Sequence, residues 1–375
     1  MKYSLYLFSF FMILFGRCQP KQPVSDEELT SYLREHWMTP EDYVMSKFAD
    51  HDYIFIGEYH RIRHDVLLIQ HLIPRMYAAG ITTLGIEFGD RRDQPLVDSL
   101  LALPEYDEAL ARKIMFHSDP LWGYKEYIDL YRVAWEVNHC DTFDHTRPFR
   151  VVNLTAHYDP CKEGGAWKDL DPDVYMAETV FQEIVAKTPK ALIYSGNHHA
   201  FTRYHQPAWD FKHDSLIHFS TKRMGNVVYD SLGNRVFNIY LHAAWTSAKG
   251  WDKKSVLPVN GTIDRVMQQF DDKRVGFDVV GTPFGRLIST DSYYALGYPD
   301  FTLDKYCDGY IYQCAFRDYQ PITMEKGFIT PENIGILKKH LRCIGVDEDF
   351  INSITVENAN EELFEDIRNH FRHLM

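Results

Sequence analysis

The sequence has few cysteines and no excess of positive charge. Its six cysteines in 375 residues include no Cys-x-x-Cys pair, which excludes the common zinc-finger spacings. The 40 lysines and arginines are outnumbered by 53 aspartates and glutamates, which argues against a nucleic-acid-binding surface. With 21 glycines and 17 prolines the chain also has no composition that would imply a long flexible linker. We therefore expect a globular protein that binds no nucleic acid.

Two common catalytic and phosphate-binding signatures are missing as well. The segment Ser195-Gly196-Asn197 lacks the preceding glycine of a Gly-x-Ser-x-Gly nucleophile elbow. No glycine-rich loop of the phosphate-cradling type is present. These absences argue against a serine hydrolase of the nucleophile-elbow type and against a nucleotide-binding loop.

Long apolar runs are confined to the first residues. One lysine precedes a run that ends at Phe15, too short for the roughly 20 apolar residues of a membrane-spanning helix. Residues 1–17 therefore read as a secretory signal, and Cys18 directly after it resembles the lipidated cysteine of bacterial lipoproteins. Arg17 departs from the small residue usual before that cysteine. We expect export to the periplasm or cell envelope, with the membrane touched only through a lipid on Cys18; secretion without lipidation is the alternative.

The remaining five cysteines leave the disulfide question open. One or two disulfides are compatible with an exported protein, and burial of most of these cysteines as small apolar residues is an equal alternative. The sequence does not indicate which cysteines would pair.

Short apolar runs alternate with amphipathic helical patterns along most of the chain. This alternation predicts an α/β fold, with a central, mostly parallel sheet and helices on both faces. Thr330-Pro331-Glu332 is a helix start signal, and charged helical patterns follow it. We predict a single α/β domain over 25–329 and a helical C-terminal extension over 330–375. The predicted strands are 53–56, 82–86, 149–154, 191–194, 236–241 and 310–314.

Histidine is the unusual residue in this composition, because 13 of the 18 histidines lie between His51 and His218. Such a density suggests metal, haem or proton-transfer chemistry. Several of these histidines follow predicted strands together with carboxylates, and polar groups at the carboxyl ends of parallel strands meet at one edge of a sheet. The residues at these strand ends are Glu58, Tyr59 and His60 after the first strand, Glu87 after the second, and His198 and His199 after the fourth, with His64 one turn into the next helix.

Each of these residues has a simpler explanation when taken alone. Glu58 could stabilise the N-terminus of the following helix. Glu87 could pair with Arg91 or Arg92, and one of the two adjacent histidines could be an ordinary loop residue. Their joint placement favours a shared pocket instead. In such a pocket a histidine could act as general base on water, oriented by a carboxylate, while a second histidine steadies negative charge.

The same side chains are also of the types that bind a divalent metal. His60, Glu58, Glu87 and His199 offer the nitrogen and oxygen atoms that Zn²⁺ or Mn²⁺ accepts. The residues do not decide between metal-assisted and metal-free chemistry.

The order of these motifs resembles a known superfamily. Phe55-Ile-Gly-Glu-Tyr-His60, Leu84-Gly-Ile-Glu87 and Tyr194-Ser-Gly-Asn-His-His199 are similar to the segments shared by erythromycin esterases, ChaN-type haem-binding lipoproteins and Tiki-type metalloproteases. The similarity covers roughly residues 40–320. The Gly-Glu-Tyr-His spacing is closer to the ChaN pattern, whereas the length and the C-terminal segments are closer to the esterase branch.

The resemblance implies two activities. The first is an exported hydrolase in which His60 activates water against an ester or amide, with Glu58 and Glu87 as carboxylate partners and His198 or His199 as the late histidine. The second is a haem-binding uptake lipoprotein in which Tyr59, His60 or His199 reaches the iron, with His64 nearby and Arg203 as a partner for a propionate. A third reading is a surface-anchored binder without catalysis. The expected partner is thus a small molecule or haem.

Overall fold

The computed structural model describes residues 23–141, 147–162, 169–251, 253–361 and 367–375. The predicted signal segment 1–17 and Cys18 lie outside these residues. None of the described helices combines the length and apolar composition that crossing a bilayer requires.

The core of the molecule is a seven-stranded sheet with the order β3-β2-β4-β1-β7-β9-β8. All neighbouring strands are parallel except β8, which runs antiparallel to β9 at one edge. This confirms the predicted mostly parallel sheet. The strands are β1 (Tyr53–Glu58), β2 (Thr83–Asp90), β3 (Arg150–Thr155), β4 (Ala191–Gly196), β7 (Val236–Leu241), β8 (Val275–Asp278) and β9 (Gly309–Tyr312).

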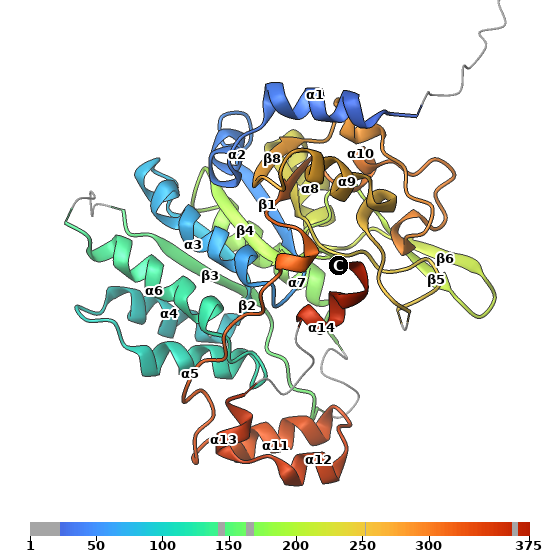
Figure 1. The fold of residues 1–375 in the computed structure, drawn as a ribbon. Coiled ribbons are helices and arrows are strands. Elements are labelled where there is room, and N and C mark those ends of the chain that lie inside the picture. Colours follow the sequence, from blue (N-terminus) through green and yellow to red (C-terminus); the bar gives the residue numbers. More distant parts are fainter. Residues whose placement is uncertain (1–22, 142–146, 163–168, 252, 362–366) are drawn as a thin grey trace, which may run out of the picture.

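Helices cover both faces of this sheet, as Figure 1 shows. Alternate residues of β1 enter different cores: Ile54 and Ile56 pack with α3, α4, α5 and α6, whereas Tyr53 and Phe55 pack with α7 and α8. Burial on both faces explains why this strand reads as an uninterrupted apolar run. The helices are α1 (Asp26–His36), α2 (Pro40–Lys47), α3 (Arg63–Ala78), α4 (Gln94–Ala102), α5 (Glu108–Ser118), α6 (Lys125–His139), α7 (Pro172–Thr179), α8 (Met224–Leu232), α9 (Thr262–Gln269) and α10 (Leu303–Tyr306).

Local sequence signals account for several helix starts. Ser25 accepts a hydrogen bond from the backbone N–H of Glu28 and caps α1, and Thr39 caps α2 with Pro40 at its first position. Helix α7 ends at Thr179, and the chain continues directly into a π-helical segment, Val180–Val185. A hairpin of β5 (Gln206–Asp210) and β6 (Ser215–Ser220), which the sequence patterns did not indicate, projects from the body.

The C-terminal part consists of short helices in two places. The first three, α11 (Ile334–Cys343), α12 (Glu348–Ser353) and α13 (Val356–Ala359), lie together at one end of the molecule in Figure 1. The fourth, α14 (Ile367–Phe371), packs back on the main body, where Phe371 is fully buried against Phe316 and Tyr319.

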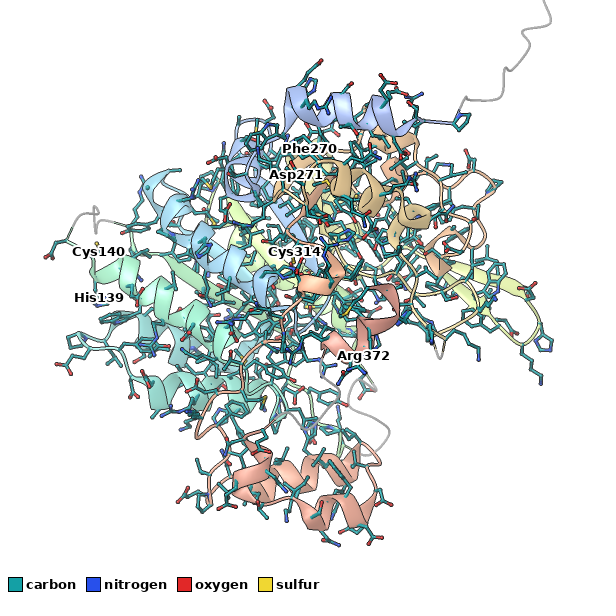
Figure 2. The ribbon with its side chains drawn as sticks, viewed as in Figure 1. His139, Cys140, Phe270, Asp271, Cys314 and Arg372 are labelled. Carbon is teal, nitrogen blue, oxygen red and sulfur yellow. A yellow bond between two sulfur atoms is a disulfide. The ribbon has the colours of Figure 1, made fainter. Side chains whose placement is uncertain are left out.

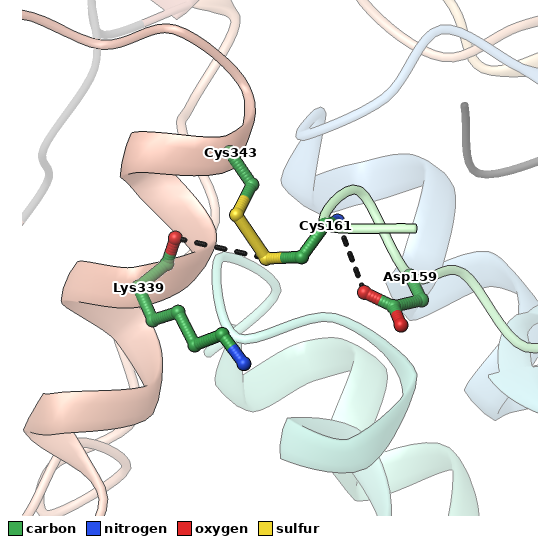
Figure 3. The surroundings of a disulfide bond; sticks show 4 residues. All are labelled: Asp159, Cys161, Lys339 and Cys343. Atoms are coloured by element: carbon green, nitrogen blue, oxygen red, sulfur yellow. Dashed lines mark hydrogen bonds between the residues drawn. A yellow bond between two sulfur atoms is a disulfide. The ribbon is translucent and has the colours of Figure 1, made fainter. Parts of the chain in front are cut away.

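A disulfide joins this C-terminal part to the α/β body. Cys161, in the connection between β3 and α7, is bonded to Cys343 at the end of α11 (Figure 3). Cys140, Cys307 and Cys314 are not disulfide-bonded, and Cys307 is buried. The described cysteines therefore form one disulfide, within the one or two that the sequence allowed. The alternative, that most of the five are buried, is wrong, since only Cys307 is buried.

Candidate functional site

The three strands that end in polar residues are neighbours in the sheet. β1 lies next to β4, and β4 lies next to β2, with Glu58 in register with Gly196. The segments after these strands therefore meet at one edge. The side chains that come together there are up to 141 residues apart in the sequence; they are Glu58, His60, Glu87, His198 and His199.

Glu58 and His60 form a hydrogen-bonded pair. Nδ1 of His60 lies 2.8 Å from Oε1 of Glu58, whose side chain is fully buried. The hydroxyl of Tyr127 donates to the same oxygen at 2.5 Å, and the hydroxyl of Tyr194 donates to Oε2. Helix α3 has Ile62 at its N-cap with no side-chain cap, so Glu58 does not serve as the helix cap that was the simpler alternative.

The environment makes His60 more basic than a free imidazole. Burial lowers the pKa of His60, but the hydrogen bond to Glu58 and the negative charges of Glu58 and Glu87 outweigh it and raise that pKa above its usual 6.5. Burial also raises the pKa of Glu58, against the hydrogen bonds from His60 and Tyr127. The hydrogen bond between Nδ1 and Oε1 thus holds the imidazole of His60 in one orientation.

The other ring nitrogen of His60 is open. Within the described residues Nε2 makes no hydrogen bond, and 39% of the His60 side chain is exposed. The ring is held edge-on by Phe88 and Trp122, with centroid distances of 5.6 and 5.2 Å. A Cβ at Gly196 would lie 2.7 Å from Cε1 of His60, so only glycine allows this close approach. The imidazole is therefore fixed on three sides and accessible on one.

A series of ion pairs lies beside the Glu58–His60 pair. Nε2 of His199 lies 3.2 Å from Oε1 of Glu87, and its Nδ1 lies 2.7 Å from Oδ1 of Asp173. Oδ2 of Asp173 in turn accepts a hydrogen bond from Nη1 of Arg223 at 2.9 Å. Oε2 of Glu87 accepts the backbone N–H of Gly196 at 2.6 Å.

These contacts fix the charges of His199 and Glu87. Although burial disfavours the cation, Glu87 and Asp173 raise the pKa of His199 to about 10. Although burial disfavours the anion, the positive charge and hydrogen bond of His199 lower the pKa of Glu87 to about 2. At neutral pH His199 is a cation between two carboxylates.

The arginines named as alternative partners of Glu87 pair elsewhere. Arg91 binds Glu183, and Arg92 binds Asp90. The simpler explanation of Glu87 as their partner is therefore wrong.

The two adjacent histidines differ in chemical state. Nε2 of His198 lies 2.9 Å from the hydroxyl of Tyr294, and burial together with nearby positive charge lowers the pKa of His198 to about 3. His198 is therefore neutral at neutral pH while His199 is charged. Both line the same cavity.

That cavity has a volume of about 530 Å³, and its wall combines tyrosine and tryptophan rings with polar and charged side chains. Tyr59 lies on its wall, where its hydroxyl is 3.1 Å from Nε2 of His370 of α14. The C-terminal part of the chain thus contributes to the site. The other lining residues include Trp122, Tyr124, Asn197, Trp245, Thr246, Trp251, Lys253, Ser255 and Tyr294.

Glu87 contacts Gly196 and His199, which line this cavity, without lining it itself. Two other predicted site residues, His64 and Arg203, lie away from it. His64 is directed behind it, 3.6 Å from Sγ of Cys314 and against the ring of Tyr319, and burial lowers its pKa to about 3. Arg203 binds Asp308 and lines a separate cavity. The structure therefore corrects the placement of both residues, because neither can contact a ligand bound next to His60 in this arrangement.

The predicted metal ligands are engaged with one another. His60 pairs with Glu58, and both nitrogens of His199 are taken by carboxylates. Across the part of the chain that the structure describes, no three His, Cys, Asp or Glu side chains are grouped as metal ligands. The donor set does not fit a metal ion, and we derive no step through one.

Comparisons with known proteins show similarity of fold only. No family model and no curated protein matches the chain. A succinoglycan biosynthesis protein of known structure superposes with a TM-score of 0.55 at 11% identity, over 80% of this chain and 99% of that chain. A Bacillus cereus protein (TM-score 0.43, 12% identity, 77% and 97% covered) and the haem-binding ChaN of Campylobacter jejuni (0.34, 10%, 55% and 87%) are more distant structural neighbours.

Several partners of the site could not be read from the sequence. Tyr127, Asp173 and Arg223 fix the predicted residues but lie in ordinary helices or turns without a local motif. His370 lies more than 300 residues from Tyr59, the residue that it contacts. A polar residue at a strand end was the only signal available, and these residues do not carry it.

Proposed function

We propose that this chain is an exported hydrolase of the superfamily that joins erythromycin esterases, ChaN-type lipoproteins and Tiki-type proteases, and that His60 is its general base. The observation that supports this most is the Glu58–His60 pair, with Nδ1 bound to a buried carboxylate and Nε2 open to a cavity of about 530 Å³. A histidine oriented in this way by a carboxylate is the usual arrangement of a general base.

The reaction follows from the two ring nitrogens. Nε2 takes a proton from a water molecule, and the water oxygen bonds to the carbonyl carbon of an ester or amide. The imidazolium then returns the proton to the leaving oxygen or nitrogen as its bond to that carbon breaks. His199 gives no hydrogen bond to the carbonyl oxygen, since Glu87 and Asp173 occupy both of its nitrogens. The negative charge of Glu87 also acts on His60 more strongly than the positive charge of His199 does, so this histidine is given no charge-stabilising role in the proposal.

Export and anchoring through Cys18 are part of the proposal. The signal-like segment at the N-terminus supports them, and so does the Cys161–Cys343 disulfide, since such bonds persist in oxidising compartments.

The test is a panel of aryl esters and anilides assayed with the wild-type protein and with His60→Ala. We expect turnover by the wild type and a loss of about 10²- to 10⁴-fold in the variant, the usual contribution of a general base. His213→Ala is the matched control, because this exposed histidine also pairs with an aspartate, Asp210, but lies on the β5–β6 hairpin. An active His60→Ala protein, or a wild type without turnover on any compound, contradicts the proposal.

Haem binding is the second candidate, and it rests on the same atom. Nε2 of His60 is a free imidazole nitrogen beside the rings of Phe88 and Trp122, the kind of setting in which a histidine ligates haem iron. Titration with hemin distinguishes it: a stoichiometric Soret shift that His60→Ala abolishes, without ester turnover, replaces the hydrolase by a haem binder. A protein that gives neither signal contradicts both candidates.

A further inference from the structure

A second cavity adjoins the one that contains His60. It has a volume of about 640 Å³ and is open to solvent. Trp251, Lys253, Ser255 and His370 line both cavities, so the two are continuous at this boundary. A ligand that reaches His60 can therefore extend into this outer cavity.

The outer cavity is basic on an acidic protein. Its described lining contains Lys253, Lys254 and Arg372 together with His370 and His373, and no carboxylate. The chain as a whole has 13 more acidic than basic residues, 53 against 40. A local excess of one sign at the mouth of a cleft attracts ligands of the opposite charge.

Packed elements hold these cations in place. Arg372 and His373 follow Phe371, which is fully buried on the main body, and Figure 2 labels Arg372 on this C-terminal segment. Nε2 of His373 lies 2.8 Å from the backbone oxygen of Ser255, so the C-terminal segment is joined to the loop that carries Lys254. Cations from two distant parts of the sequence thus line one cavity, on segments that are joined to each other.

An exposed aromatic ring lies between the two cavities. Trp251 is 55% exposed, which is unusual for a side chain of this size. Its ring contacts those of Tyr293 and His198, with centroid distances of 4.8 and 5.6 Å. A fixed, exposed indole at a cavity boundary offers a flat surface for the part of a ligand that connects the two cavities.

We propose that the outer cavity binds an anionic group, a carboxylate or a phosphate, of a substrate whose scissile bond lies at His60. Lys254 and Arg372 bind the anion, and Trp251 contacts the segment between the anion and the scissile bond. The inference rests on the proposed hydrolase and narrows its substrates to anionic esters or amides. Arginine and lysine both bind carboxylate and phosphate oxygens, so the two anions are separate arms of the test.

The first experiment compares aryl esters of equal acyl length that end in a methyl group, a carboxylate or a phosphate. We expect the wild type to prefer an anionic ester in kcat/KM. In the double variant Lys254→Glu with Arg372→Glu, the ratio of anionic to neutral kcat/KM falls about tenfold, mostly through KM. The charge-matched control is Lys212→Glu with Lys326→Glu, two exposed lysines that line neither cavity. A wild type that prefers the methyl ester, or equal effects of the two double variants, overturns the inference.

The second experiment separates this inference from the hydrolase itself. Binding of glutarate and of inorganic phosphate to the His60→Ala protein is measured by calorimetry and by tryptophan fluorescence at low and high salt. We expect binding that weakens with salt and that the Lys254→Glu/Arg372→Glu changes remove. If the anions bind in this way but the wild type hydrolyses no ester, the anion site is supported and the proposed hydrolase activity is contradicted. If the wild type hydrolyses esters but neither anion binds, the hydrolase activity is supported and the anion site is contradicted.

Discussion

At the scale of single residues, the carboxylate of Glu58 determines the behaviour of His60. It raises the pKa of His60 by a hydrogen bond and by its charge, against the lowering effect of burial. A general base works in its neutral form, so kcat/KM should rise with pH through a pKa above 6.5. The pH dependence of the wild type therefore reports the Glu58–His60 pair directly.

Glu58→Gln tests this dependence. The amide keeps the shape of the side chain but removes its charge, and burial then lowers the pKa of His60. We expect the ascending limb of the pH profile to move to lower pH, with a plateau reduced about 10²-fold or more because the base is weaker and its tautomer is no longer fixed. Asp210→Asn is the control, because it changes an exposed aspartate–histidine pair on the hairpin. If the ascending limb of the pH profile is unchanged in Glu58→Gln, the pKa of the general base does not depend on Glu58, which contradicts the assignment of the Glu58–His60 pair.

Some residues of the site could be selected from the sequence, and their partners could not. Glu58, His60 and Glu87 could be selected because a polar side chain after a buried strand needs a partner. The identity of that partner could not, since Tyr127 and Asp173 come from helices that fold next to the strand ends only in three dimensions. His64 has the same residue type and a position one turn further on, yet the direction of α3 turns it away from the cavity.

At the scale of elements, the buried parallel strands were predictable and the edges of the fold were not. β1 and β4 are apolar on both faces, and their sequence limits were found within about two residues. The hairpin strands β5 and β6 carry Pro207 and exposed polar residues, and β8 contains only four residues, so none has a pattern that distinguishes it from a loop. The site depends on the central strands, which explains why its location could be predicted when these elements could not.

The end of β4 provides a test at this scale. Gly196 must lack a side chain, because a Cβ there would lie 2.7 Å from Cε1 of His60 and 3.3 Å from Oε2 of Glu87. We expect Gly196→Ala to displace the imidazole, to lower kcat/KM about 10²-fold and to cost about 1–3 kcal/mol of stability. Gly335→Ala is the control, since nothing lies within 4 Å of its added methyl group. Unchanged kcat/KM in Gly196→Ala would show that His60 need not hold this position.

At the scale of the whole molecule, the C-terminal part is attached to the body in two ways. Helix α14 packs against Phe316 and Tyr319 and brings His370 to the cavity that contains His60. The disulfide ties α11 to the connection between β3 and α7. The predicted extension therefore takes part in the site through its last helix, a role that its charged, helical sequence did not indicate.

The Cys161–Cys343 disulfide should stabilise the whole molecule. Cys161 and Cys343 are 182 residues apart, so their bond closes a long loop and removes much of the entropy of the unfolded chain. We expect Cys161→Ser with Cys343→Ser to lower the free energy of unfolding by about 2–4 kcal/mol in denaturant titrations. Reductant should lower the stability of the wild type to the same level and leave the double variant unchanged, because the other described cysteines, Cys140, Cys307 and Cys314, are not disulfide-bonded. A wild type that is equally stable with and without reductant would show that the bond does not stabilise the fold, and α11 would then have to be held by its packing alone.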